Sequence, residues 1–416
     1  MRVFKFGGAS VKDANGVKNL LSVLKKVGYN DTLIVVSAMG KTTNALEVVL
    51  DNYFNKQSEL QSSIQDIKKY HNGILLDLFE NENHKVFDKV SNLFLELDSF
   101  FKTNKSPDYN FVYDQVIGFG ELISTTIISS FLEQEGLKNN WLDVREYIKT
   151  DNYYRRANVD WNSTQINISK KVNQSILNIT QGFLGSDSNN FTTSLGREGS
   201  DYTAAIFAFC LNAESVTIWK DVPGVLNADP RYFENAQLLN KISYREAIEL
   251  AFYGASVIHP KTLQPLQRKE IPLHVKSFLN PESPGTIVGK EIGIDPKVPC
   301  FILKQNQVLL SLSTLDFSYI MEDNISEIFN LLHLYKMKVD VIQNSAISFS
   351  VCFDNTFKNL DKLLHHLKAK FKVTCYDKVS LYTIRHYNEE SINQLEANKK
   401  ILLKQILGET VQIVTE

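Results

Sequence analysis

Lys5-Phe6-Gly7-Gly8-Ala9-Ser10 connects a short apolar run to a helical pattern. Val3 and Phe4 before it are typical of a buried strand, and the apolar residues of 17–27 recur at helical spacing until Gly28 ends the helix. In such a junction, glycines let the backbone approach a phosphate, while the helix N-terminus and Lys5 add positive charge. The stretch therefore predicts a phosphate-binding turn, with a purely structural turn as the alternative.

The bulk composition favours a multidomain protein that acts on small molecules. A chain of 416 residues with 43% hydrophobic residues is long enough for two or three domains. Its net charge of -2 leaves no basic surface for nucleic acid or membrane. The four cysteines lack paired spacing, which argues against a zinc site and favours the reducing cytoplasm. We see no signal region and no apolar run of about 18 residues, so a membrane span is not expected.

Strand and helix patterns alternate from residue 1 to about 290 and predict a doubly wound, mostly parallel α/β sheet. The apolar run 33–36 ends at Ser37, and ligand groups in such sheets lie at the carboxyl ends of strands. Gly40-Lys41-Thr42 imitates the end of a P-loop, but Val35 stands where that motif requires glycine. Residues 44–101 predict a helical excursion beside the sheet.

A second glycine loop, 196–201, precedes an apolar helix that we expect to run from Tyr202 to Leu211. Earlier in the chain, Ser124 and Thr125 are expected to open another apolar helix, which makes Glu121 a residue near a helix start. An isolated Glu121 is ordinarily a solvated partner of the helix dipole. An isolated His259 before proline is likewise more often structural than catalytic.

The Pro/Gly-rich stretch 280–299 is the best candidate for a domain boundary. Beyond it, the patterns indicate the β-α-β-β-α-β order of a ferredoxin-like module. The last predicted elements are a helix over 389–407 and a closing strand over 410–414. Such modules commonly bind ligands or pair with one another, so a sensor or dimerisation role is expected.

Taken in order, these motifs resemble those of aspartate kinases. The matching stretches are KFGGASV at 5–11, VVSA at 35–38, GEL at 120–122, LGR at 195–197, GSDYTAA at 199–205, DPR at 229–231, HP at 259–260 and PGT at 284–286. The resemblance covers residues 1 to about 290, and the tail resembles the family's ACT regulatory region. It implies an α/β amino acid kinase fold, three-layer α/β/α with a mostly parallel sheet, over residues 1–290. A ferredoxin-like α+β ACT-type module over 300–416 would follow, with its second ACT unit curtailed.

The resemblance implies transfer of the ATP γ-phosphoryl group to L-aspartate, giving 4-phospho-L-aspartate for lysine, threonine and methionine biosynthesis. Phosphoryl transfer relies on positioning and charge stabilisation, which suits these residue types. The resemblance assigns roles to the matching positions: catalytic Lys5 and Asp201; phosphate-binding Gly7, Gly8 and Ser10; substrate-binding Ser37, Thr43, Glu121, Arg197 and Ser200; nucleotide-binding Lys220, Asp221 and Arg231; regulatory Asp340, Val341 and Ser345. Mg²⁺ would bridge mainly phosphate oxygens, without a dedicated set of protein ligands.

Three positions depart from the family pattern. Lys220 replaces a frequent threonine, Leu226 replaces a frequent tyrosine, and Ser256 replaces a lysine that contacts ATP in many members. Lys220 or Lys261 is the candidate for the missing charge. A kinase of another carboxylate, such as glutamate, and a catalytically impaired amino-acid-binding regulator are the alternative functions. A homodimer and feedback inhibition by lysine or threonine are also expected.

Overall fold

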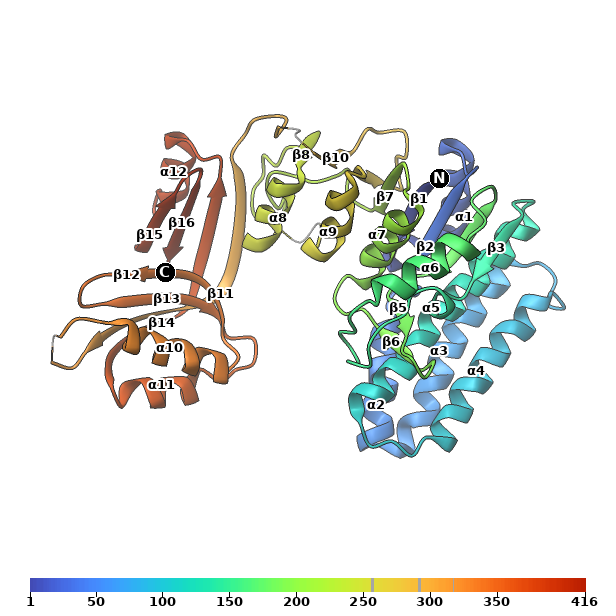
Figure 1. The fold of residues 1–416 in the computed structure, drawn as a ribbon, viewed down its shortest axis with the longest axis horizontal. Helices are drawn as coiled ribbons and strands as arrows, with labels where there is room; N and C mark the ends of the chain where they lie inside the picture. Colours follow the sequence, from blue (N-terminus) through green and yellow to red (C-terminus); the bar gives the residue numbers. More distant parts are fainter. Residues whose placement is uncertain (256–257, 291–292, 317) are drawn as a thin grey trace. The chain divides into compact units, whose positions relative to one another are not determined.

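The computed structural model describes residues 1–255, 258–290, 293–316 and 318–416, which form two compact units (Figure 1). The first unit contains Met1–Val225, Leu238–Ile248 and a stretch that ends at Ile294. The second contains Asp295–Glu416, together with Leu226–Gln237 and a short segment that begins at Glu249. Two segments that precede residue 290 in the chain therefore pack with the C-terminal tail.

An eight-stranded sheet forms the centre of the first unit, in the order β3-β4-β2-β1-β7-β9-β10-β8. All its neighbouring strands pair in parallel except β9 and β10. The prediction of a mostly parallel α/β sheet is thus confirmed. The strands are β1 (Arg2–Phe6), β2 (Thr32–Val36), β3 (Asn139–Leu142), β4 (Leu177–Gln181), β7 (Ser215–Lys220), β8 (Lys241–Ser243), β9 (Leu273–Ser277) and β10 (Thr286–Gly289). A separate hairpin joins β5 (Leu184–Ser186) to β6 (Thr192–Ser194).

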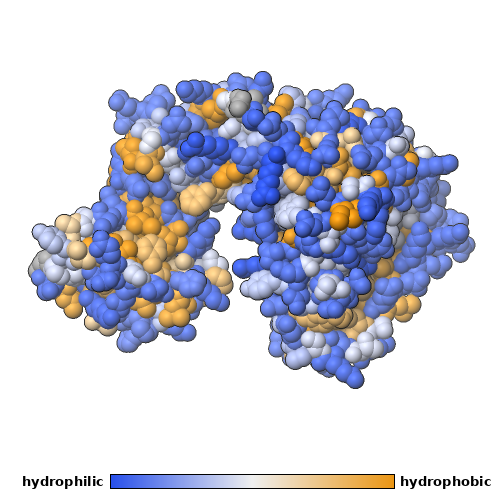
Figure 2. All heavy atoms as spheres, in the orientation of Figure 1, coloured by the Kyte–Doolittle hydropathy of each residue, from blue (hydrophilic) through white to orange (hydrophobic). Residues whose placement is uncertain are grey.

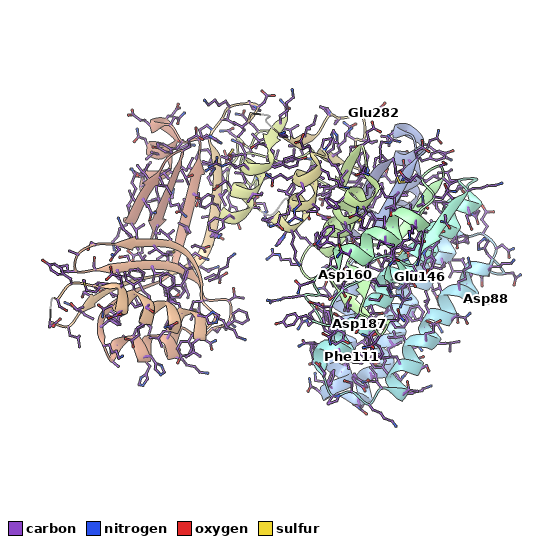
Figure 3. All side chains as sticks on the ribbon, in the orientation of Figure 1. Asp88, Phe111, Glu146, Asp160, Asp187 and Glu282 are labelled. Atoms are coloured by element: carbon purple, nitrogen blue, oxygen red, sulfur yellow. The ribbon has the colours of Figure 1, made fainter. Side chains whose placement is uncertain are left out.

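Helices pack on this sheet, and the apolar faces of the first five of them form one large core with it. They are α1 (Ala14–Val27), α2 (Thr42–Asn55), α3 (Gln57–Leu78), α4 (Lys85–Thr103), α5 (Tyr109–Gln134), α6 (Trp161–Lys171), α7 (Gly199–Leu211), α8 (Tyr244–Tyr253) and α9 (Pro260–Lys269). Local caps fix several of their starts: Asp160 accepts from the amides of Asn162 and Ser163 at the start of α6 (Figure 3). α1 ends at Gly28, whose φ is +81°, as the sequence predicts.

α5 corrects one prediction. It begins at Tyr109, capped by Asp108, so Ser124 and Thr125 lie inside the helix rather than opening it. Both hydroxyls are satisfied there, because Ser124 donates to the carbonyl of Ser37 at 2.8 Å and Thr125 donates to that of Glu121 at 2.9 Å. α5 is also the one described helix long and apolar enough to cross a membrane, but 83% of its apolar stretch is buried, as in a core helix.

The second unit contains a six-stranded antiparallel sheet in the order β12-β13-β11-β14-β16-β15. Its elements are β11 (Cys300–Thr314), α10 (Glu322–Leu334), β12 (Lys338–Asn344), β13 (Phe349–Asp354), α11 (Leu360–Lys368), β14 (Phe371–Arg385), α12 (Glu389–Glu396), β15 (Ile401–Leu407) and β16 (Thr410–Thr415). The run from β11 to β14 has the ferredoxin-like order, as predicted.

β11 and β14 are each 15 residues long and belong to two successive modules. Their far ends pair with one another, Cys300 opposite Arg385, and the end of β14 also pairs with β16. α12, β15 and β16 therefore extend the same two strands into a second set of elements, with one helix. The predicted helix over 389–407 is wrong in its second half. Asn398, at φ +61°, follows the end of α12, and the residues from 401 pair as β15.

Candidate active site

Lys5 and Asp201 form an ion pair at the centre of the first unit. Lys5 lies on the central strand β1, Asp201 lies in the first turn of α7, and Lys5 Nζ is 2.7 Å from Asp201 Oδ1. The two side chains are only 12% and 4% exposed. Phe4 and Phe6 of the same strand pack instead on Trp219, because alternate residues of a strand face opposite sides of the sheet. The pair therefore brings together two residues that lie far apart in the chain.

Of the two predicted phosphate-loop glycines, Gly8 has no room for a side chain, whereas Gly7 is tightly packed against the end of the Lys5 side chain. A Cβ on Gly7 would lie 3.2 Å from Lys5 Nζ, and a Cβ on Gly8 would lie 2.7 Å from the carbonyl oxygen of Ala38. The loops after β1 and β2 are joined directly, since the amide of Gly40 donates to the carbonyl of Gly8 at 3.0 Å. Ser10 is buried in the short 3-10 turn Gly8–Val11, and its amide donates to the carbonyl of Gly7. The close approach of the two loops explains why glycine is required.

Glu121 is a buried carboxyl group with one oxygen unsatisfied. It is 3% exposed, and its Oε1 accepts from the amide of Ala38 at 3.3 Å. Within the described part of the chain, Oε2 has no hydrogen-bond partner. Burial raises the pKa of Glu121 to about 8. A ligand that donates hydrogen bonds or carries a positive charge would satisfy this oxygen, so Glu121 is a binding-site candidate rather than the solvated helix-start residue of the ordinary case.

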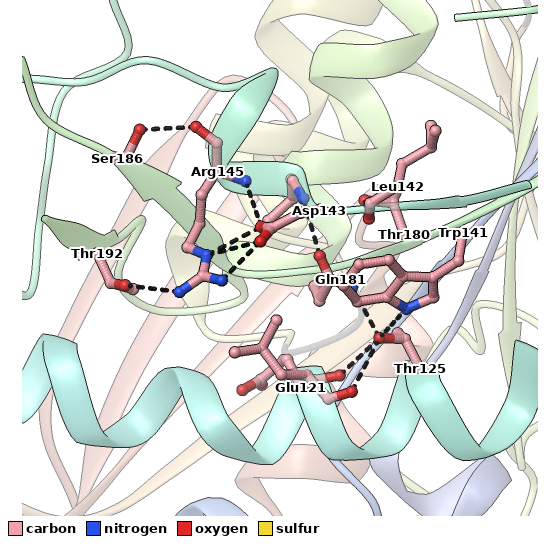
Figure 4. A network of polar contacts seen from close by, with 12 residues as sticks. Glu121, Thr125, Trp141, Leu142, Asp143, Arg145, Thr180, Gln181, Ser186 and Thr192 are labelled. Carbon is pink, nitrogen blue, oxygen red and sulfur yellow. Dashed lines mark hydrogen bonds and ion pairs between the residues drawn. The ribbon is translucent and has the colours of Figure 1, made fainter. Parts of the chain in front are cut away.

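A polar network holds the backbone of α5 around Glu121 (Figure 4). The Thr125 hydroxyl donates to the Glu121 carbonyl and accepts from Trp141 Nε1 at 3.0 Å and Gln181 Nε2 at 2.8 Å. Trp141 belongs to β3 and Gln181 to β4, while Gln181 Oε1 accepts from the amide of Val144 at 2.8 Å. Two strands thereby fix the part of α5 that carries Glu121.

Asp114, two turns before Glu121 on α5, holds the approach to the second glycine loop. It is fully buried and accepts from the amide of Ser194 at 2.8 Å, the Ser194 hydroxyl at 2.6 Å and the amide of Arg155 at 2.9 Å. Its burial raises its pKa, although these hydrogen bonds oppose the shift. Asp114 was not among the predicted site residues. The sequence does contain a signal for it, since a carboxylate in the middle of an apolar run is unusual and suggests a buried role.

The second glycine loop leads into α7. Gly196 has φ +81° and Glu198 has φ +54°, so the chain turns sharply before the helix begins. Arg197 is exposed, whereas Ser200 is buried against Gly182, where a Cβ would lie 2.4 Å from that of Ser200. The loop thus holds Ser200 and Asp201 inside the protein while Arg197 faces solvent.

The remaining predicted substrate and nucleotide residues lie at the ends of several elements. Ser37 follows β2 and Thr43 lies in the first turn of α2. Lys220 ends β7, and Asp221 follows it in an exposed position. Arg231 belongs to the second compact unit, where its guanidinium pairs with Asp229 at 2.6 Å. Ser256 lies outside the described residues.

Lys261 lies against the second glycine loop. Its Nζ donates to the carbonyl of Leu195 at 3.4 Å and lies 5.3 Å from the ring centroid of Tyr202. Burial, and secondarily the charge of Arg156, lower the pKa of Lys261. A side chain of Gly196 would contact Arg156, which places that cation beside the same loop. Lys261 and Arg156 therefore increase the positive charge around the start of α7.

The three predicted regulatory residues differ in environment. Asp340 on β12 is paired with Lys304, Nζ to Oδ1 at 2.7 Å, and its side chain is 6% exposed. Val341 is buried at 2% exposure. Ser345 is exposed after β12, and its hydroxyl lies 2.7 Å from that of Ser348.

No group of three or more His, Cys, Asp or Glu side chains that could hold a metal ion occurs in the described ranges.

Comparisons with known proteins agree on one group of enzymes. A model of the amino acid kinase family matches residues 1–277. The chain is 32% identical over 359 residues to the lysine-sensitive aspartokinase 3 of Escherichia coli (strain K12), covering 85% of this chain and 78% of that protein. It is 28% identical over 383 residues to the chloroplastic bifunctional aspartokinase/homoserine dehydrogenase 2 of Arabidopsis thaliana. That match spans 89% of this chain but only 42% of the bifunctional protein.

Solved structures show the same similarity over the full chain. The E. coli aspartokinase III structure in complex with lysine and aspartate has a TM-score of 0.84 at 28% identity, covering 100% of this chain and 95% of that one. The complex of that enzyme with aspartate and ADP has a TM-score of 0.82 at 27% identity, covering 100% and 96%. The Clostridium acetobutylicum aspartate kinase, at 21% identity, a TM-score of 0.82 and coverage of 100% and 96%, shares the fold.

Proposed function

The chain belongs to the amino acid kinase family and, within it, to the aspartokinases, and on this basis we propose that it phosphorylates L-aspartate with ATP. The products are ADP and 4-phospho-L-aspartate, which opens the route to lysine, threonine and methionine. The observation that carries the proposal is the buried Lys5–Asp201 pair, held at 2.7 Å between two glycine loops. Such a fixed ammonium beside backbone amides suits phosphoryl transfer, in which catalysis is mainly positioning and charge stabilisation.

Lys5 is the residue that stabilises the charge of the transferring phosphoryl group. Asp201 holds its ammonium in place, and Gly7 and Gly8 allow the backbone to approach the phosphate oxygens. Ser10 completes this phosphate site. Because the pair is buried, the interaction is stronger than it would be in water.

Glu121 and Arg197 are the two charged groups of the proposed aspartate pocket. The unsatisfied Oε2 of Glu121 accepts the substrate's α-ammonium, and the exposed Arg197 guanidinium binds a carboxylate through a two-pronged pair. The smaller polar side chains that complete the pocket are Ser37, Thr43 and Ser200. The relative solved with aspartate and ADP supports this choice of substrate and nucleotide.

Lys220, Asp221 and Arg231 are each proposed as nucleotide-binding residues because of their place in the family's motifs, and Mg²⁺ would enter with the phosphate groups of the nucleotide. Ser256 departs from the family's lysine, and Lys261 is our candidate for the replacement charge. Its support is the contact with the Leu195 carbonyl, on the loop that carries Arg197.

Residues 300–416 are the proposed regulatory region, and residues 1–290 the catalytic domain. Lysine or threonine would bind at Asp340, Val341 and Ser345, which is supported by the E. coli relative solved with lysine. We also propose a homodimer in the cytoplasm. Hydrophobic residues gather on the visible face of the C-terminal unit (Figure 2), and the exposed ones in this unit include Ile342, Ile401 and Ile406. Exposed apolar patches of this kind mark interaction sites.

A coupled ADP-release assay tests the proposed function. Purified protein, ATP and Mg²⁺ are combined with aspartate, glutamate or acetylglutamate, with and without lysine or threonine. We expect release with aspartate that is lost in Lys5→Ala. Release with another carboxylate would change the substrate, and amino-acid binding without ADP release would identify an impaired regulator.

A further inference from the structure

Tyr70, in the middle of α3, contacts both loops of the proposed phosphate site. Its hydroxyl donates to the carbonyl of Lys12, where the first glycine loop meets α1. Its oxygen also fills the space beside Gly40, since a Cβ on Gly40 would lie 2.6 Å from it. Tyr70 is 38% exposed, so it is not a core residue. Its hydroxyl contacts are therefore not a mere by-product of core packing.

His71, the next residue of α3, contacts the loop after β2 from the buried side. It is 0% exposed, with Nδ1 2.8 Å from the carbonyl oxygen of Ile67 and Nε2 3.4 Å from Thr42 Oγ1. A carbonyl only accepts hydrogen bonds, so Nδ1 carries the proton and Nε2 presents a lone pair to the hydroxyl. Burial lowers the pKa of His71 to about 4, which keeps the ring neutral at physiological pH. The Thr42 hydroxyl has one hydrogen, which goes mainly to the carbonyl of Met39 at 2.7 Å, so Nε2 at 3.4 Å accepts only the weaker branch of this shared hydrogen bond.

The two loops depend on each other for their position. They are joined by the hydrogen bond from the Gly40 amide to the Gly8 carbonyl at 3.0 Å. A cavity of about 290 Å³, lined by residues that include Lys41, Ala45 and Tyr70, leaves free space beside this junction. The loop after β2 could therefore shift toward α3 if the contacts of Tyr70 and His71 were removed.

We propose that Tyr70 and His71 are positioning residues for phosphoryl transfer, which hold the loop 7–12 and the loop 38–42 together so that Lys5 and the loop amides keep their geometry. The expected effect on phosphoryl transfer rests on the proposed kinase function, whereas the loop contacts themselves do not depend on it. The Tyr70 hydroxyl bonds to Lys12 and the His71 ring bonds to Ile67 and Thr42, whereas Lys5 pairs with Asp201. Their effect on the pair would therefore pass through the two loops.

Tyr70→Phe tests the hydroxyl with little change in packing. We expect kcat/KM for ATP to fall about 2- to 10-fold, the range for loss of one hydrogen bond, with the melting temperature lowered by no more than about 4 °C. Tyr53→Phe is the matched control, because the Tyr53 hydroxyl is likewise hydrogen-bonded outside its own helix, although as an acceptor, from Asn104 Nδ2 at 3.1 Å. Tyr53 lies in the last turn of α2, at the end of that helix away from the loop 38–42. An equal loss in both variants, or none in Tyr70→Phe, would overturn the role of Tyr70.

His71→Gln and His71→Leu separate the hydrogen bond from the volume. Glutamine can place an acceptor near the position of Nε2, whereas leucine fills the site without one. We expect His71→Gln to keep most of the activity and His71→Leu to lose part of it, about 2- to 10-fold, while remaining folded. Equal activity in the two variants would show that His71 acts only by filling space.

Amide hydrogen exchange provides a readout that does not depend on activity. The amides of Ser10 and Gly40 are hydrogen-bonded inside the two loops, to Gly7 and Gly8. Tyr70→Phe should accelerate their exchange several-fold, and Tyr53→Phe should not. Unchanged exchange would refute the inference even in an active kinase. Accelerated exchange in a protein that releases no ADP would instead leave the loop contacts established and refute the proposed function.

Discussion

The ammonium of Lys5 lies 2.7 Å from the carboxylate of Asp201, and the two side chains are 12% and 4% exposed. A buried charge is costly without its partner, so this pair links the stability of the α/β unit to its proposed chemistry. β1 and the start of α7 meet at this point. The effects on stability and on catalysis can be separated by experiment. Folding stability depends on whether the ion pair is complete, whereas catalysis depends on the Lys5 ammonium.

Lys5→Met should abolish ADP release and destabilise the protein by about 3–5 kcal/mol, because Asp201 is left buried and unpaired. The double variant Lys5→Met/Asp201→Leu should recover much of that stability but none of the activity. Urea unfolding and the coupled assay measure the two effects. A double variant as unstable as Lys5→Met would show that the unpaired carboxylate is not the cause.

Glu121 should make stability depend on pH. Its pKa is raised from 4.5 to about 8 in the folded protein, so the folded state holds the extra proton between these values. Stability should therefore fall as pH rises from about 4.5 to about 8 and level off above. The difference between wild type and Glu121→Gln in unfolding free energy should reproduce this slope. A difference independent of pH would contradict the raised pKa.

The same group should affect substrate binding. An ionised Glu121 binds an ammonium group better than a protonated one, so the KM for aspartate should fall as pH rises through about 8. Glu121→Gln should raise this KM and remove that part of the pH dependence. Steady-state kinetics at constant ionic strength test it, and an unchanged profile in the variant would place the α-ammonium elsewhere.

Gly8→Ala should damage catalysis through geometry alone. The new Cβ would lie 2.7 Å from the Ala38 carbonyl oxygen, so one loop must move, and a displacement of about 1 Å can cost roughly 100-fold in rate. Gly73→Ala is the control, because a Cβ added at this exposed helical position would have no atom within 4 Å. It should stabilise α3 by about 1 kcal/mol and leave kcat unchanged.

Lys261→Ala should raise the KM for ATP if Lys261 supplies the charge that Ser256 lacks. Lys269→Ala is a control on the same helix, since its ammonium donates to the carbonyl of Phe209 at 2.6 Å, at the other end of α7. That variant should lose stability without a change in KM. Unchanged ATP KM in both Lys261→Ala and Lys220→Ala would refute the compensation.

Asp340→Asn should weaken inhibition by lysine or threonine, because the amide cannot bind an ammonium group as a carboxylate does. Lys304→Met should have the opposite effect, since the Lys304 ammonium occupies Asp340 at 2.7 Å and an effector would have to displace it. Inhibition curves for both variants decide this. The same half-inhibitory concentration in wild type and Lys304→Met would exclude the competition.

The alternating patterns predicted the central sheet because its strands are apolar runs buried on both faces, as in 33–36. Predictions failed where local signals were misleading. Ser124 and Thr125 resemble a helix start, but both lie inside α5, where the Ser124 hydroxyl donates to the carbonyl of Ser37 and the Thr125 hydroxyl to that of Glu121. Residues 401–407 resemble a continued helix, yet they pair with β16, a partner that local propensity does not reveal.

The candidate site residues also fall into those that sequence motifs reveal and those that only the packing reveals. Lys5, Gly8 and Asp201 stand in recognisable motifs, so sequence alone could propose them, and their roles stay predictions. Tyr70 and His71 stand in an ordinary amphipathic helix with no motif around them. Their contacts with Lys12 and Thr42 arise from the packing of α3. Tyr70 and Lys12 are 58 residues apart in the chain, and His71 and Thr42 are 29 residues apart.

β11 and β14 also limit how this protein can be rearranged in evolution. Since each strand continues from the ferredoxin-like unit into the elements that follow it, neither part can be removed or exchanged alone without cutting both strands in mid-length. A chimera with a relative must therefore exchange the whole tail, together with Leu226–Gln237 and the segment that begins at Glu249, which pack with it.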